Sequence, residues 1–175
     1  GVSLAFVPED RLGMGLVGSL DMVDNMLIRS YKNNKGPLVD RKTPKQVCDE
    51  LIEALEIVTP GTSTPVRRLS GGNVQKVLLG REIHYNPKVL MVAYPVRGLD
   101  INSSFKIYDL LNEQKKKGVA VLFVGEDLDV LMEISDRIMV LCGGAVSGIV
   151  DPRTATKEDV GLLMVHAGGE KEAKA

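Results

Sequence analysis

The residues best placed to do chemistry form the segment Leu69-Ser70-Gly71-Gly72-Asn73-Val74-Gln75-Lys76, here called the Ser70 loop. A serine and two glycines stand directly before a helical run. Backbone N–H groups at such a position lie at the positive end of the helix and have no acceptor within it. The segment therefore predicts a loop that holds a polyphosphate.

Size and charge limit the classes of protein to consider. The chain has 175 residues, which is enough for one domain, or one domain with a subdomain, and a real core. Its formal net charge of −1 shows no electrostatic footprint for nucleic acid or an anionic membrane. The longest apolar runs are far shorter than the roughly 20 residues that span a bilayer. We expect protein partners and no nucleic acid, and any membrane association would come through a partner.

Cysteine and histidine give no sign of a metal site. Cys48 and Cys142 lie far apart in apolar surroundings, which favours reduced core thiols. His84 and His166 have no cysteine or histidine at ligand spacing. We expect no resident metal.

Strand-like and helix-like segments alternate, which predicts an α/β fold with a mostly parallel sheet flanked by helices, a helical subdomain and a C-terminal β-hairpin. The run Val89 to Val92 is continuously apolar, as in strands covered on both faces. Expected strands are residues 4–7, 89–92, 119–124 and 138–142, the last forming a hairpin with 145–150. Expected helices are residues 22–28, 44–58, 73–84, 101–117, 127–134 and 156–165.

The expected helix after residue 100 carries two further predictions. Ile101, Phe105, Tyr108 and Leu111 recur at helical spacing, so we expect them to line its apolar face. The run Lys115 to Gly118 is typical of a helix C-terminus and is not read as a nucleic-acid patch.

Taken in order, these segments resemble the second half of an ATP-binding cassette (ABC) ATPase, from just before the Q-loop to the C-terminus. The Ser70 loop matches the LSGGNQQK form of the signature motif, with Val74 for one glutamine. Residues 6–11 resemble the Q-loop region of the second cassette of tandem importer ATPases, with Glu9 at the glutamine position. Asp24-Asn25 resembles the start of the helical subdomain. Residues 95–100, which include Gly98, Leu99 and Asp100, resemble the PTRGLD form of the D-loop, with Val96 for threonine. Glu126 lies at the switch position.

The departures from the family pattern concern catalysis. Ala93 and Tyr94 stand where the Walker B motif has two carboxylates. Neither side chain can bind Mg²⁺ or orient the attacking water as a carboxylate would. Glu126 replaces a phosphate-sensing histidine, and an acid would repel phosphate. No Gly-Lys-Ser or Gly-Lys-Thr occurs, so the Walker A loop would lie upstream of Gly1.

The resemblance implies a divided role. Ser70, Gly71 and Gly72, with Asn73 and Gln75 nearby, would contact ATP held by a partner cassette. The chain's own site would be catalytically degenerate, and the chain alone is predicted to be inactive. ATP and Mg²⁺ would act only in the intact assembly. The implied partners are that cassette, transmembrane permease subunits and, indirectly, a substrate-binding lipoprotein, at the cytoplasmic side of the cell membrane.

The resemblance also implies a division of the chain. Residues 1–10 would be the strand and Q-loop region, 11–80 the helical subdomain, 81–167 the rest of the core, and 168–175 a frayed tail.

Several alternatives remain open at this point. Loss of the Walker B acids favours nucleoside-type importers with a BMP-type lipoprotein over ribose-type or other simple-sugar importers. A non-catalytic, ABC-derived module that docks a membrane subunit is a second reading, although the intact Ser70 loop favours a retained role. A free-standing enzyme would need a richer glycine turn than Gly13-Met14-Gly15 supplies.

Overall fold

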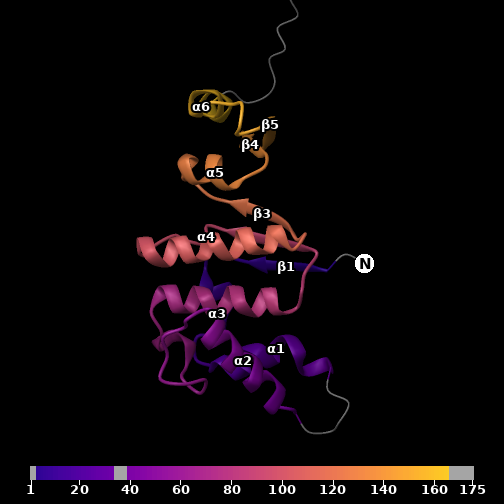
Figure 1. The fold of residues 1–175 in the computed structure, drawn as a ribbon, viewed down its shortest axis with the longest axis vertical. Helices are drawn as coiled ribbons and strands as arrows, with labels where there is room; N and C mark the ends of the chain where they lie inside the picture. The colour runs from indigo at the N-terminus through magenta and orange to yellow at the C-terminus, as the bar shows by residue number, and fades with distance from the viewer. Residues whose placement is uncertain (1–2, 34–38, 166–175) are drawn as a thin grey trace, which may run out of the picture. The chain divides into compact units, whose positions relative to one another are not determined.

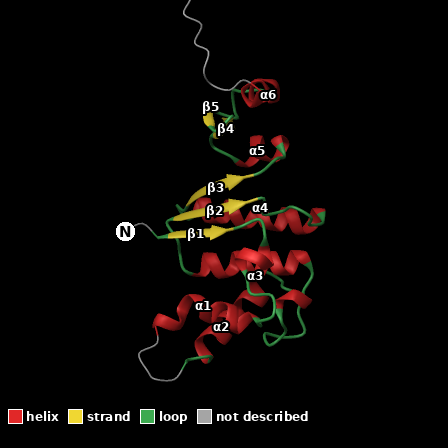
Figure 2. Cartoon of the chain, turned by 180° about the vertical axis from the view of Figure 1, so that it is seen from behind, coloured by secondary structure: helices red, strands yellow, loops and turns green. Residues whose placement is uncertain are grey.

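The computed structural model describes residues 3–33 and 39–165, and the expected tail at 168–175 lies outside them. The chain divides into two compact units, Gly1–Val124 and Gly125–Ala175, which are described separately below. Figures 1 and 2 together label the helices and strands of both units.

A parallel sheet organises the first unit. Its strands are β1 (Leu4–Val7), β2 (Val89–Ala93) and β3 (Ala120–Val124), hydrogen-bonded in the order β1-β2-β3. Leu4 pairs with Val89, and Val89 pairs with Ala120. Because all three strands run in one direction, as Figure 2 shows, their carboxyl ends share one edge of the sheet. The three predicted strands and their parallel arrangement are confirmed.

Two helices cover one face of this sheet. α3 (Gly71–His84) packs on β1 and α4 (Ile101–Lys116) packs on β3, with the two helices beside each other (Figure 1). Alternate strand residues, such as Val7, Leu90 and Val92, are buried beneath them. The other residues of the same strands are half-buried or exposed; Leu122 keeps 43% exposure. Among the described residues, one face of β2 is fully buried and the other is half-buried, so the prediction that both faces are covered is confirmed for one face only.

The buried face of α4 shares only Leu111 with the predicted one. Ile107, Leu111 and Gln114 are buried, whereas Ile101 and Phe105 are exposed. The buried positions recur at i, i+4 and i+7, which is one side of a helix. Tyr108 instead makes an edge contact with the ring of Phe123 at 6.2 Å. The spacing of apolar residues in the sequence is compatible with burial of either face of α4. Packing against α3 and β3 decides which face is buried.

The helical part of the first unit is built from α1 (Met22–Ser30) and α2 (Lys42–Ala54), which pack together. Short helical turns η1 (Arg11–Gly15), η2 (Tyr31–Asn33) and η3 (Val66–Arg68) complete it. α2 ends before the predicted residue 58, because the backbone leaves helical geometry at Glu56, whose φ is +50°. The fully buried Asn25 accepts from Val17 N–H at 2.8 Å and donates to the carbonyl of Asp21 at 2.9 Å. Asn25 therefore fixes the chain that enters α1.

The second unit contains α5 (Leu128–Ile134), β4 (Ile138–Cys142), β5 (Ala145–Val150) and α6 (Lys157–Val165). β4 and β5 form the predicted antiparallel hairpin. Gly143 and Gly144 connect them with φ values of +58° and +80°, as a tight turn between two strands requires. Ile138, Val140 and Val160 form its buried centre. Across the residues described in both units, no helix is long and apolar enough to cross a membrane.

Candidate functional site

The Ser70 loop opens α3. Ser70 is the N-cap: its hydroxyl accepts from the backbone N–H of Asn73 at 3.4 Å and from the Asn73 side-chain amide at 2.9 Å. A serine at this position satisfies one of the four N–H groups that a helix start leaves without partners. Ser70 and Gly71 are exposed, and Gly72 is half-buried. The loop thus presents a helix N-terminus with little side-chain cover.

The side chains of Asn73 and Gln75 each bond to a different segment outside the Ser70 loop. The Asn73 side-chain oxygen accepts from Val58 N–H at 2.9 Å, so this residue ties the loop to the segment that follows α2. Gln75 is only 1% exposed, and its side-chain oxygen accepts from Arg11 Nε at 2.7 Å. Within the described part of the chain, Gln75 Nε2 has no hydrogen-bond partner. Both side chains therefore hold the loop from within the fold.

Lys76, the last residue of the Ser70 loop, also bonds to another segment of the first unit. Its ammonium group donates to the carbonyl of Glu56 at 2.9 Å, and burial lowers the pKa of Lys76 from its ordinary value. It therefore fixes α3 against the end of α2.

A second cluster lies at the carboxyl ends of β1 and β2 and is called the β2 edge: Ala93 and Tyr94 with Glu9 and Arg97. Tyr94 has a φ of +48°, a left-handed conformation that is uncommon for a bulky residue. Arg97 forms an ion pair with Glu9, and its guanidinium carbon lies 5.9 Å from the centroid of the Tyr94 ring. Glu9, which follows β1, therefore faces a cation from the loop that follows β2.

The loop after β2 also reaches the Ser70 loop. A Cβ atom at Gly71 would lie 3.6 Å from the side chain of Leu99, and one at Gly72 would lie 2.7 Å from Ser103 Oγ. Gly98 has a φ of +70°, which glycine adopts readily. The start of α4 and the start of α3 are therefore in close contact.

Asp100 has a structural task in this arrangement. Its carboxylate caps α4, accepting from Ser103 N–H at 2.9 Å and from the Ser103 hydroxyl at 2.7 Å. These hydrogen bonds, the hydroxyl first, hold the pKa of Asp100 below its ordinary value. Asn102 to Ser104 form the first turn of α4, which confirms the prediction of a helix start there.

Glu126 belongs to the second unit, where it is exposed just before Asp127, the N-cap of α5. The remaining predicted residues, from Glu9 to Asp100, belong to the first unit. Sequence reasoning missed Arg11 and Arg97 as site residues. Both lie inside quoted motifs, but only their tertiary contacts show what they bind.

Solved structures share this architecture. A dimeric ATP-binding cassette in a post-hydrolysis state, bound to ADP and Pi, matches with a TM-score of 0.72 at 22% identity, over 88% of this chain and 65% of that one. An inward-facing metal-chelate type ABC transporter matches with a TM-score of 0.74 at 19% identity, over 93% and 64% of the two chains. The fold is that of an ATP-binding cassette.

Sequence relatives agree with this fold. The galactose/methyl galactoside import ATP-binding protein MglA of Shigella boydii serotype 4 is 40% identical over 159 residues, which are 89% of this chain and 31% of that protein. The protein of the same name from Escherichia coli K12 gives the same values. This chain thus spans about a third of the length of these curated relatives. No family model matches it.

The β2 edge does not fit Mg²⁺. Magnesium requires oxygen ligands, usually carboxylates with water. Ala93 and Tyr94 offer no carboxylate, and the Glu9 carboxylate is paired with Arg97. Across residues 3–33 and 39–165, no group of three or more His, Cys, Asp or Glu side chains could hold a metal ion.

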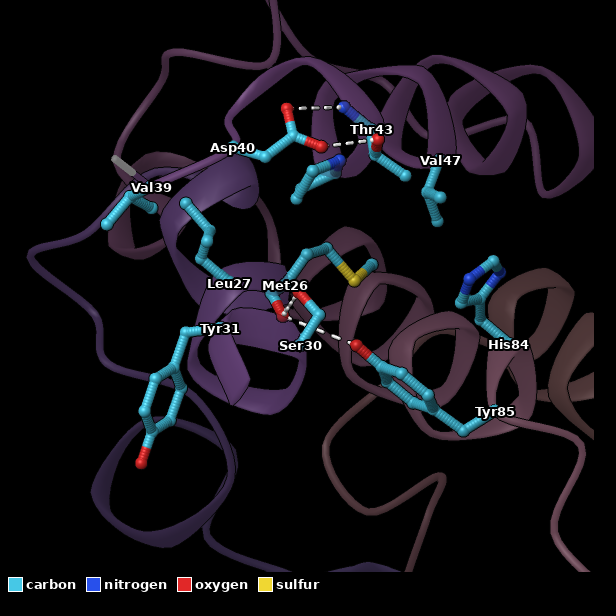
Figure 3. Close-up of a pocket in the computed structure, with 11 residues that line it drawn as sticks. Met26, Leu27, Ser30, Tyr31, Val39, Asp40, Thr43, Val47, His84 and Tyr85 are labelled. Atoms are coloured by element: carbon cyan, nitrogen blue, oxygen red, sulfur yellow. Dashed lines mark hydrogen bonds between the residues drawn. The ribbon is translucent and has the colours of Figure 1, made fainter. Parts of the chain in front are cut away.

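A pocket of about 300 Å³ lies elsewhere in the first unit, between α1, α2 and the end of α3. Figure 3 shows the Tyr85 hydroxyl directed at the carbonyl of Met26, a contact of 3.4 Å, and Asp40 hydrogen-bonded to Thr43. Leu27 and Val47 supply apolar walls. None of the predicted nucleotide-contacting residues lines this pocket, so it forms no part of the candidate site.

Proposed function

We propose that this chain is part of the ATP-binding subunit of an ABC importer and that its Ser70 loop contacts ATP held by a second cassette. The observation that supports this proposal is the exposed start of α3. Backbone N–H groups at a helix N-terminus bind phosphate through direct hydrogen bonds and through the helix dipole. Ser70 and Gly71 are exposed, so a second subunit can reach them from outside the domain.

The chain's own site serves as a structural or regulatory half-site in this proposal. Phosphoryl transfer needs Mg²⁺ and a residue that orients the attacking water. The β2 edge supplies neither group, since Ala93 and Tyr94 replace the acids and Arg97 neutralises Glu9. We therefore expect no ATP hydrolysis above background from the isolated chain.

The partners and the solute are inferred from relatives. The similar proteins are named for galactose and methyl galactoside import, which supports a simple sugar as the solute; nothing in them supports the nucleoside-type assignment suggested by the missing acids. The partner cassette, permease subunits and a binding lipoprotein would place the chain at the cytoplasmic side of the membrane as a peripheral subunit. Residues 11–80 would be the subdomain that couples to the permease.

The test compares two substitutions in the assembled importer. Ser70→Arg places a long side chain at the exposed start of α3, and we expect the ATPase rate to fall by about 10²-fold, the size of effect seen when a donor to developing charge is lost. Tyr94→Ala should leave the rate within about twofold, because Tyr94 supplies no group to the reaction.

Ser63→Arg is the matched control. It adds the same side chain to an exposed serine before η3 and should leave the ATPase rate unchanged. If Ser70→Arg behaves like Ser63→Arg while the thermal midpoints agree, the Ser70 loop takes no part in ATP turnover. The chain would then be a non-catalytic module that docks a membrane subunit.

A further inference from the structure

The turn η1 lies along one side of α3. Gln75, Leu78 and Arg81 follow each other at intervals of three residues, so they share that side of the helix. Gln75 accepts from Arg11 Nε at 2.7 Å, and Arg81 donates to the carbonyl of Gly15 at 2.7 Å. A Cβ atom at Gly15 would lie 2.7 Å from a terminal methyl carbon of Leu78, so any other residue there would require Leu78 to move. η1 and α3 thus form one packed unit.

Arg11 also reaches the loop that follows β2. Its Nη2 donates to the backbone carbonyl of Arg97. Its Nη1 lies 3.6 Å from the position of a Cβ atom at Gly71, next to the exposed start of α3. One half-buried guanidinium group therefore bonds to Gln75 of α3 and to the loop after β2, and it lies near the first residue of α3.

We propose that Arg11 is the positioning residue of the Ser70 loop, holding the first turn of α3 against the loop after β2 through its simultaneous bonds to Gln75 and to the Arg97 carbonyl. The inference rests on the proposed function in one respect: the task of the Ser70 loop, which is to contact ATP held by a second cassette. It does not make Arg11 a group that touches nucleotide. Arg11 acts on the loop through the two acceptors that it connects.

The geometry requires arginine at this position. A guanidinium group presents several N–H donors in a fixed plane, so it reaches two acceptors in different segments at once. A lysine ammonium group carries the same charge but is a compact point donor on a flexible stem. Arg11→Lys therefore keeps the charge and loses one of the two connections.

The test measures amide hydrogen exchange by NMR in the full 175-residue chain, without nucleotide or partner. The reporter is Val74 N–H, which donates to the carbonyl of Ser70 at 2.9 Å and opens when the first turn of α3 opens. We expect both Arg11→Ala and Arg11→Lys to raise its exchange rate about tenfold, the effect of one lost hydrogen bond to a charged group, and to shift the amide signals of Gly71 and Gly72.

Arg68→Ala is the control, because it removes an exposed arginine two residues before Ser70 and should leave these signals unchanged. Gln75→Met removes the acceptor at similar side-chain length and should reproduce the effect of Arg11→Ala, with no further increase in the double variant. This variant keeps the test decisive if Arg11→Ala fails to fold.

Wild-type exchange in Arg11→Lys, or an equal response to Arg68→Ala, would overturn the positioning role. Faster exchange in the Arg11 variants together with unchanged ATPase in Ser70→Arg would instead retain the positioning role and reject the proposed function.

Discussion

The Ser70 loop and the β2 edge lie in the same unit, and they differ in what they can offer a nucleotide. The Ser70 loop offers backbone N–H groups at the start of a long helix, and the side chains of Asn73 and Gln75 bond it to other segments of the first unit. The β2 edge has Ala93 and Tyr94 where β2 ends, and its one carboxylate, Glu9, is paired with Arg97. A helix start binds anions through its backbone and tolerates sequence change, whereas a metal site disappears with its carboxylates.

The largest expected effect concerns the helix that supports the Ser70 loop. Leu78 is fully buried beneath Gly15, so Leu78→Ala should lower the free energy of unfolding by about 2–5 kcal/mol, through lost burial and the cavity left behind. Leu122→Ala, on the exposed face of the sheet, should cost less than about 1 kcal/mol. Urea unfolding of the two variants checks this difference, and equal midpoints would contradict it.

The next effect separates the two glycines of the Ser70 loop. Gly72→Ala brings a Cβ atom to 2.7 Å from Ser103 Oγ and 3.2 Å from Ser103 Cβ, so we expect a loss of about 1–3 kcal/mol from overpacking. Gly71→Ala meets nothing nearer than 3.6 Å and should be close to neutral.

The contact with Ser103 can be checked separately. Thermal unfolding of Gly72→Ala with and without Ser103→Gly measures the coupling between these positions. If Ser103→Gly gave no relief, the contact between the starts of α3 and α4 would not be the cause.

A smaller effect is expected from the ion pair of the β2 edge. Glu9 and Arg97 are both exposed, so Glu9→Gln should change the free energy of unfolding by less than about 1 kcal/mol. The difference should vanish in 1 M salt, where the screening length is about 3 Å. Glu53→Gln, an exposed carboxylate on α2, is the matched control. A difference that survives high salt would mean that Glu9 has a role other than pairing.

The smallest effect concerns the pH dependence of the α4 cap. The pKa of Asp100 is lowered in the folded chain, so its contribution to stability is complete above the ordinary pKa of an aspartate. That contribution is lost as the pH falls through the lowered folded value. Ser103→Ala removes the first cause of the shift and should raise the pKa of Asp100, as measured by NMR titration. Asp40, held similarly by Thr43, should titrate unchanged.

The sequence predicted the elements well where local signals are strong. Ser70 and Asp100 are the N-caps of α3 and α4, and Gly118 lies in a left-handed conformation just beyond the end of α4. α3 begins at Gly71, two residues before the predicted start, so the two glycines belong to the helix. The short apolar runs predicted three parallel strands, and Gly143-Gly144 predicted the hairpin of the second unit. The absence of acids at Ala93 and Tyr94 could also be read directly, because the type of a side chain needs no structure to establish.

Only the tertiary structure decided which surfaces meet. Periodicity placed Ile101, Phe105 and Leu111 on the apolar face of α4. Packing against α3 and β3 buried Leu111 together with Ile107 and left Ile101 and Phe105 exposed. It also joined Arg11 to Gln75, and Glu9 to Arg97, across 64 and 88 positions of sequence. Capping and strand formation depend on neighbouring residues, so the sequence determines them. Contacts between distant segments depend on how helices and strands pack, and that information is absent from any local pattern.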